Sequence, residues 1–163
     1  MNRIAFSVAA IALVLSGRAF ADVKPSALFS DHAVLQSGMS VPVWGAADPG
    51  EKVTVAVAGQ TQSATAGADG KWMVRLTNLK PGGPFVMSVD GKNHIEVKDV
   101  LVGEVWLGSG QSNMQFTVSK KAASFAGLIN EEQEIADANY PQIRMFTAKG
   151  TKSYDPKADV TGE

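Results

Sequence analysis

The chain has 163 residues, a formal net charge of −1 and no cysteine. These values exclude disulfide bonds and thiolate chemistry, and no basic run is present that would attract nucleic acid. Hydrophobic residues make up 45% of the sequence, which is typical of a globular protein with a packed core.

The first 21 residues have the pattern of a secretory signal peptide. Arg3 precedes an apolar run, Ile4 to Leu15, and the segment ends in Ala19-Phe20-Ala21, a small-x-small cleavage pattern. The run is shorter than the roughly 20 residues that a membrane-spanning helix needs. We therefore expect a secreted or periplasmic protein whose mature chain starts at Asp22 and has no membrane segment. Loss of Arg3 and Arg18 from the 15 basic residues leaves 13 against 16 acidic ones, a net charge of −3.

Residues 22–98 are predicted to form a β-sandwich, because short alternating strands are separated by turns. Larger apolar residues occupy every second position in several runs, as expected for strands with one buried face. The segments between the runs are rich in Gly, Pro and Asp, including Asp-Gly pairs that favour hairpin turns. This spacing indicates a small antiparallel sandwich of the immunoglobulin-like type. The inward-facing positions are Val53, Val55, Val57, Trp72, Val74, Leu76, Phe85, Met87, Val89, Ile95 and Val97.

The pattern changes near residue 99, and residues 99–163 are predicted to begin an α/β domain. Residues 100–102 and 105–107 are apolar on both faces, which is typical of a strand buried within a parallel sheet. A helix is expected from about Glu131 to Ala138 with Asn130 as its cap, and residues 143–146 form the next expected strand. Strand, helix and strand make one βαβ unit, which cannot bury both faces of its sheet. We therefore expect this second domain to be incomplete, and either marginally stable or dependent on contacts with the sandwich.

A glycine- and serine-rich segment, residues 108–113, follows the predicted strand directly. A serine just beyond the C-terminal end of a parallel strand lies at the sheet edge where ligands bind. The N–H groups of a tight turn can also hold an oxyanion. Met114 stands where the lipase-type elbow has its second glycine, and the Gly-Lys-Ser/Thr ending of a phosphate loop is absent. From spacing and composition alone, an ordinary turn is the favoured interpretation of this segment.

Several blocks of the sequence resemble the sialate O-acetylesterase family, which is part of the wider GDSL/SGNH hydrolase superfamily. The resemblance implies a flavodoxin-like α/β hydrolase domain after the sandwich, and a serine esterase that acts on O-acetylated sugars without a cofactor. The blocks occur in order over most of residues 23–147: residues 28–36 (LFSDHAVLQ), 41–45 (VPVWG), 49–53 (PGEKV), 69–72 (DGKW), 102–107 (VGEVWL), 110–114 (GQSNM) and 140–146 (YPQIRMF).

The resemblance implies that Ser112 is the catalytic nucleophile. Its hydroxyl would attack an acetyl ester carbonyl, and water would hydrolyse the resulting acyl-enzyme. Gln111 and Asn113 flank it and are candidates for substrate binding, whereas Ser109 is a weaker candidate for the nucleophile. The full-length parent is then expected to be a carbohydrate O-acetylesterase, with O-acetylated sialic acid as its expected substrate. An acetylxylan-type esterase is an alternative, because plant-polysaccharide acetylesterases share this type of block.

An activating partner for Ser112 is missing from the sequence. A catalytic serine needs an adjacent base that is itself oriented by a third group. Members of the superfamily supply this base from an Asp-x-x-His pattern near the C-terminus. His32 and His94 both precede Ser112, and each is interpreted as a hydrogen-bonded histidine of the sandwich. We therefore expect this chain to be truncated, with little or no esterase activity of its own.

Other side chains support no further catalytic site. The two histidines lack metal-ligand spacing, so neither a metal nor a cofactor is expected. Glu131, Glu132 and Glu134 are interpreted as a solvated helix face. Trp44 and Trp72 could form a sugar-stacking platform, but packing in the core is the favoured interpretation. A non-catalytic β-sandwich module that binds glycans or a protein partner is the remaining alternative.

Overall fold

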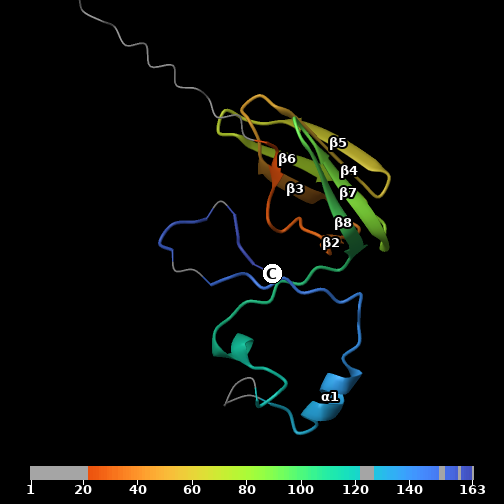
Figure 1. Ribbon diagram of the computed structural model, residues 1–163, viewed down its shortest axis with the longest axis vertical. Helices are drawn as coiled ribbons and strands as arrows, with labels where there is room; N and C mark the ends of the chain where they lie inside the picture. Colours follow the sequence, from red (N-terminus) through yellow and green to blue (C-terminus); the bar gives the residue numbers. More distant parts are fainter. Residues whose placement is uncertain (1–21, 122–126, 151–152, 158, 163) are drawn as a thin grey trace, which may run out of the picture.

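The computed structural model describes residues 22–121, 127–150, 153–157 and 159–162. The predicted signal peptide, residues 1–21, lies outside the described residues. Figure 1 shows a β-sandwich and, below one end of it, a segment with little regular structure. In these ranges no helix has the length and apolar character needed to cross a membrane.

The sandwich consists of two sheets. The smaller sheet has the strand order β1-β3-β6, and the larger sheet has the order β2-β8-β7-β4-β5. All pairings are antiparallel except that of β2 with β8, which is parallel. The strands are β1 (Lys24–Pro25), β2 (Val34–Gln36), β3 (Val41–Ala46), β4 (Lys52–Val57), β5 (Gln60–Thr65), β6 (Lys71–Leu76), β7 (Gly82–Asp90) and β8 (His94–Gly103).

The core lies between the two sheets and is built from the alternating apolar residues. Val53 and Val55 of β4, Val74 and Leu76 of β6 and Val89 of β7 are all buried in one core cluster, in which Val89 is paired with Val55. Burial of one such side chain stabilises the fold by about 1.5–3 kcal/mol. The predicted sandwich and its inward-facing positions in β4 and β6 are therefore confirmed.

Alternation of apolar residues does not predict β5, because the residues of this strand are polar or small and mostly exposed. The strand lies at the edge of the larger sheet and pairs with β4 from Gln60–Val57 to Thr65–Lys52. Ala58 and Gly59 connect the two strands with φ angles of 50° and 76°, the positive values that a tight hairpin turn of this kind requires. A polar edge strand also discourages pairing with other chains.

The strand at residues 100–102 belongs to the sandwich, so its assignment to an α/β sheet is wrong. These residues form the second half of β8, and Val100 and Val102 are buried in the sandwich core. The other side of the stretch is partly covered, and Leu101 is aligned with Val34 of β2. The larger sheet therefore continues past residue 98 to Gly103, and the sandwich contains one parallel pair.

The βαβ unit predicted for residues 99–163 does not form in the described part of the chain. Helix α1 (Glu131–Asp137) is present where expected, but residues 105–107 and 143–146 form no strand. A strand with two apolar faces needs neighbouring strands to pair with and helices that cover both faces. Among the described residues, no strand pairs with residues 105–107 or 143–146. Trp106 and Leu107 are instead 89% and 94% exposed. As far as the structure describes it, the segment after the sandwich contains one 3₁₀ turn, η1 (Ser112–Gln115), and helix α1.

Candidate functional site

Ser112 is the first residue of η1, in the segment that follows β8. The N–H of Met114 donates to the carbonyl oxygen of Gln111 at 2.9 Å, and that of Phe116 donates to the carbonyl oxygen of Asn113 at 3.4 Å. These bonds close the turn and leave the side chain of Ser112 exposed to solvent. Within the described part of the chain, neither its hydroxyl nor its N–H has a hydrogen-bond partner.

The small residues before Ser112 allow the chain to fold tightly around Met114. A Cβ atom on Gly108 would lie 3.0 Å from Cε of Met114, and one on Gly110 would lie 3.1 Å from its Cγ. Both separations are closer than an ordinary van der Waals contact, so a larger residue at either position would displace the methionine. The glycines therefore serve the shape of the turn that presents Ser112.

Gln111 and Asn113 lie beside Ser112 through their place in the chain, and both are exposed. Their backbone carbonyl oxygens accept the two bonds that close the turn. Their predicted role in substrate binding stays a prediction, as does the nucleophilic role of Ser112. Ser109 is exposed as well, three residues earlier in the same loop.

Both histidines pair with aspartates of the sandwich. Nδ1 of His32 lies 2.6 Å from Oδ2 of Asp99, and Nδ1 of His94 lies 2.5 Å from Oδ1 of Asp90. Their interpretation as hydrogen-bonded sandwich histidines is confirmed. His94 is the first residue of the ten-residue strand β8. It therefore lies roughly 30 Å from the end of that strand, where the chain leaves the sandwich toward Ser112. Among the described residues, no hydrogen bond joins either histidine to Ser112.

Gln36 and Ser37 hold the chain at the point where it leaves β8. Nε2 of Gln36 donates to Oε2 of Glu104 at 3.0 Å, and Oγ of Ser37 donates to its Oε1 at 3.1 Å. The N–H of Val105 donates to Oε1 of Gln36 at 2.8 Å. Periodicity does not predict this contact, which joins residues of two separate sequence blocks, 28–36 and 102–107.

Arg144 joins the segment to the sandwich a second time, at Asp99. Its Nη1 donates to the carbonyl oxygen of Asp99 at 2.7 Å, and its Nη2 lies 3.1 Å and 3.0 Å from the carboxylate oxygens Oδ1 and Oδ2. The hydrogen bond with His32, followed by that with Arg144, holds the pKa of Asp99 below its ordinary value. Asp99 is therefore a carboxylate kept in its charged form.

Asp159 makes a third connection to the sandwich. The hydroxyl of Ser26, which is buried, donates to Oδ1 of Asp159 at 2.6 Å, and the N–H of Ala27 donates to its Oδ2 at 3.3 Å. The hydrogen bond with Ser26 is the main cause that lowers the pKa of Asp159. Sequence reasoning missed all three connections, because each joins residues more than 65 positions apart or, for Arg144, 45 positions apart.

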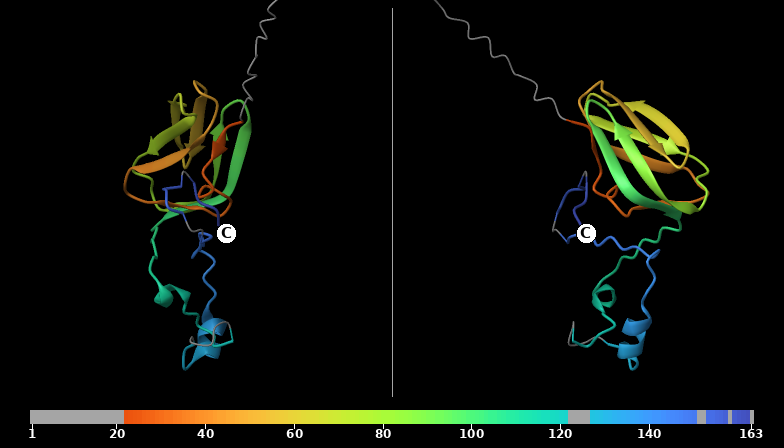
Figure 2. Two further views of the ribbon diagram at one scale, coloured as in Figure 1. Left: turned by 90° about the vertical axis from the view of Figure 1, so that its left-hand side faces the viewer. Right: turned by 45° about the vertical axis from the view of Figure 1, so that its right-hand side comes forward.

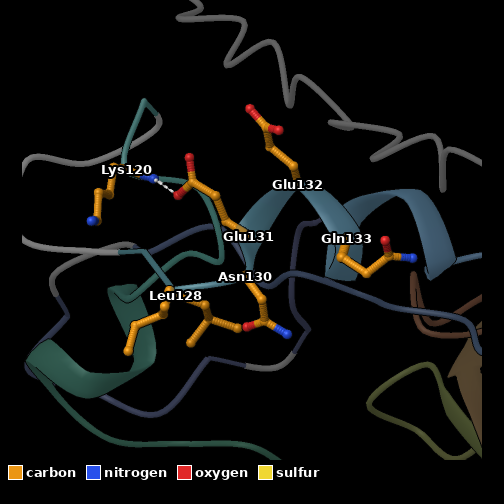
Figure 3. Close-up of a pocket in the computed structure, with 7 residues that line it drawn as sticks. Lys120, Leu128, Asn130, Glu131, Glu132 and Gln133 are labelled. Carbon is orange, nitrogen blue, oxygen red and sulfur yellow. Dashed lines mark hydrogen bonds between the residues drawn. The ribbon is translucent and has the colours of Figure 1, made fainter.

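An open hollow of about 470 Å³ lies beside the start of α1 (Figure 3). Three of its lining residues already form hydrogen bonds: the N–H of Lys120 donates to Oε2 of Glu131 at 2.8 Å, and Nδ2 of Asn130 donates to Oε1 of Glu134, outside the lining, at 2.7 Å. Asn130 therefore precedes the helix as predicted but makes no side-chain cap bond. Ser112 does not line this hollow. In the residues described, no group of three His, Asp or Glu side chains is placed to hold a metal ion.

The two sandwich tryptophans pack within the protein. Trp72 is buried in the core and donates its indole N–H to the carbonyl oxygen of Ala46 at 3.1 Å. Trp44 is partly buried and packs edge-on against Phe29, with ring centroids 4.9 Å apart. The interpretation of both as packing residues is confirmed, and they form no exposed stacking platform.

Comparisons with known proteins confirm the resemblance seen in the sequence blocks. The chain is 36% identical over 145 residues to the sialate O-acetylesterase of Rattus norvegicus and 35% identical over 144 residues to that of Homo sapiens. These matches cover 81% and 80% of this chain but 26% of each relative. A crystal structure of a carbohydrate acetylesterase from Xanthomonas citri matches with a TM-score of 0.77 and 36% identity, covering 86% of this chain and 32% of that chain. No family model matches the sequence.

Proposed function

We propose that this chain, which is homologous to the sialate O-acetylesterases over about four-fifths of its length, carries the nucleophile of a carbohydrate O-acetylesterase. The proposed nucleophile is Ser112, and the proposed location is secreted or periplasmic. The observation that carries the proposal is the exposed hydroxyl of Ser112, which has no hydrogen-bond partner among the described residues and lies at the start of a tight turn, in a chain homologous to carbohydrate esterases. The chain spans 26% of the length of its curated relatives, so the proposal concerns the chemistry of a longer enzyme.

In the proposed reaction, Oγ of Ser112 forms a bond to the acetyl carbonyl carbon while its proton passes to a general base. The bond between the acetyl group and the sugar oxygen then breaks, and the sugar leaves as an alcohol that regains the proton. Water hydrolyses the acetyl-serine and restores the enzyme. The N–H of Ser112, which has no acceptor in the described residues, is available to the oxyanion of the intermediate.

The described residues place no general base beside Ser112. His32 and His94 are paired with Asp99 and Asp90, and no histidine follows Ser112 in the sequence. A serine hydroxyl without an adjacent base is a weak nucleophile at neutral pH. We therefore expect the 163-residue polypeptide by itself to hydrolyse p-nitrophenyl acetate at a rate that Ser112→Ala does not change.

A hybrid enzyme tests the role of Ser112 directly. Residues 22–163 are joined to the part of the Xanthomonas citri acetylesterase that follows its aligned region, and acetate release from O-acetylated sugars is measured. Ser112→Ala should lower kcat by roughly 10⁴-fold or more, whereas Ser109→Ala, in the same loop, should retain activity. Circular dichroism confirms that each variant is folded. A folded, active hybrid that tolerates Ser112→Ala but not Ser109→Ala would reassign the nucleophile.

The proposal also names the sugar that carries the acetyl group. The rat and human relatives are sialate O-acetylesterases, which supports O-acetylated sialic acid as the substrate. The measurement is kcat/KM of the hybrid for O-acetylated sialic acid and for acetylated xylan, side by side. A higher value for the sialic acid supports the proposal, and a higher value for the xylan assigns an acetylxylan-type esterase instead.

A further inference from the structure

Two contacts fasten the segment that carries Ser112 to the same end of the sandwich. The chain leaves the sandwich at Glu104, which is held by Gln36 and Ser37, and it meets the sandwich again where Arg144 binds Asp99. Asp99 lies just before the short parallel pairing of β2 with β8, and Glu104 lies just after it. Figure 2 shows the chain between these contacts running away from the sandwich and returning to it.

Arg144 forms the return contact through two separate nitrogens. One binds the backbone carbonyl oxygen of Asp99, and the other binds its carboxylate. A guanidinium presents such a fork of donors, whereas a lysine ammonium is a single point of charge. The side chain of Arg144 is 18% exposed and that of Asp99 is 36% exposed, so the arginine is partly shielded from water while the aspartate remains in contact with it.

Asp99, the residue that binds Arg144, is itself held in place by contacts within the sandwich. Asp99 has a φ of 56° and His32 a φ of 70°, and both angles lie in the left-handed region. The N–H of His32 donates to the carbonyl oxygen of Lys98 at 3.0 Å, and the His32 ring lies against the Asp99 carboxylate. The carboxylate is thus fixed between a histidine of the sandwich and an arginine of the returning segment.

We propose that His32, Asp99 and Arg144 form a clamp that positions the segment carrying Ser112 on the sandwich. Holding both ends of the chain between residues 105 and 143 at one place removes conformations that a chain held at one end would sample. The three side chains are positioning residues and take no part in the ester chemistry. Only the consequence of the clamp for catalysis rests on the proposed function of Ser112.

Hydrogen exchange measured by mass spectrometry on the full chain tests the clamp. Arg144→Ala should raise the exchange rate of peptides from residues 140–146 several-fold and leave peptides from β3, β4 and β7 unchanged. Arg144→Lys should also raise this exchange rate, because a point-like ammonium lacks the planar fork that reaches the carbonyl oxygen and the carboxylate of Asp99 from separate nitrogens. The matched control is Arg75→Ala, which removes an exposed arginine from β6 and should change neither region. Unchanged exchange at residues 140–146 in Arg144→Ala, an equal effect of Arg75→Ala, or general loss of protection in the sandwich would each overturn the clamp.

A double-mutant cycle tests whether Arg144 acts through Asp99. Asp99→Asn removes the charge but keeps a residue type that tolerates positive φ, so it should release residues 140–146 less than Arg144→Ala does. The double variant should exchange no faster than Arg144→Ala alone, since both changes break one interaction. Additive effects would show independent roles and overturn the proposal. Exchange is measured without substrate, so failure of the clamp and failure of the Ser112 assignment are separate results.

Discussion

The indole ring of Trp72 occupies the space that a side chain on Gly45 would need. The two residues face each other across β6 and β3, and a Cβ atom on Gly45 would lie 2.8 Å from Cζ2 of Trp72. The same Cβ atom would also meet the carbonyl oxygen of Lys24 and the Cα of Pro25 in β1. A glycine is therefore required here by close approach of the backbone and the ring.

Gly45→Ala is expected to lower the free energy of unfolding by about 3 kcal/mol or more, because overpacking of this kind displaces backbone as well as side-chain atoms. The matched control is Gly103→Ala, whose new Cβ atom would meet only Cγ1 of Val34 at 3.9 Å. Urea unfolding followed by tryptophan fluorescence measures both variants. Equal stabilities of the two variants would contradict the steric explanation.

Replacement of leucine by alanine should have different effects on stability at positions 76 and 107. Leu76 is fully buried in β6, so Leu76→Ala should cost about 2–5 kcal/mol of unfolding free energy through lost burial and the cavity that remains. Leu107 is 94% exposed, so Leu107→Ala should change the stability by at most about 0.5 kcal/mol. Denaturant unfolding compares the variants, and a large loss on truncation of Leu107 would show that it packs against another part of the protein.

Gln36→Ala should make residues 104 and 105, which directly follow β8, more mobile. The substitution removes the acceptor of the Val105 N–H and the donor to Glu104, so the exchange rate of the Val105 amide should rise. The loss of these solvent-exposed hydrogen bonds should cost about 0.5–1 kcal/mol of unfolding free energy. Gln62→Ala, on the exposed face of the edge strand β5, serves as the control and should leave the Val105 amide unchanged. If Gln36→Ala leaves the exchange rate of the Val105 amide unchanged, the hydrogen bond between Val105 and Gln36 is excluded.

The sandwich could be predicted because its strands have one buried and one exposed face. Trp72 and Val74 alternate with exposed neighbours, and Val53 and Val55 alternate with neighbours that are less buried than they are, and that period of two is visible in the sequence. The polar strand β5 carries no such signal, since an edge strand is held by backbone bonds to its neighbour. The apolar run at residues 100–102 fits either a strand of an α/β sheet or a strand of the sandwich. Only the pairing of β8 with β2 and β7 shows that it belongs to the sandwich.

The candidate site was predictable only in part. The glycines and Ser112 lie next to one another in sequence, and the structure places them together in one exposed turn. The apolar residues 105–107 and 143–146 indicate strands, but a strand forms only where a neighbour supplies hydrogen bonds. The pairing of Asp99 with Arg144 has no local signal, because it depends on how the chain returns to the sandwich after 45 residues.

The surface pair of Asp90 and His94 should make stability depend on pH in two separate ranges. Their mutual hydrogen bond lowers the pKa of Asp90 from 3.8 and raises the pKa of His94 from 6.5, and Glu96 and Ser88 support the same directions. A raised histidine pKa stabilises the fold below pH 6.5, and this contribution is lost as the pH rises through the folded value. A lowered aspartate pKa stabilises the fold above pH 3.8, and this contribution is lost as the pH falls through the folded value. The pair should therefore contribute most between these limits.

A nuclear magnetic resonance titration of the His94 ring measures the effect. Asp90→Asn removes the main cause of the raised pKa, so the His94 midpoint should fall toward 6.5. Asp99→Asn removes the aspartate beside His32 and should leave the His94 midpoint where it is, which makes it the matched control. Both members of the Asp90–His94 pair are largely exposed, so added salt should weaken the shift. A His94 midpoint that is the same in the wild type and in Asp90→Asn would show that the 2.5 Å contact does not persist in solution.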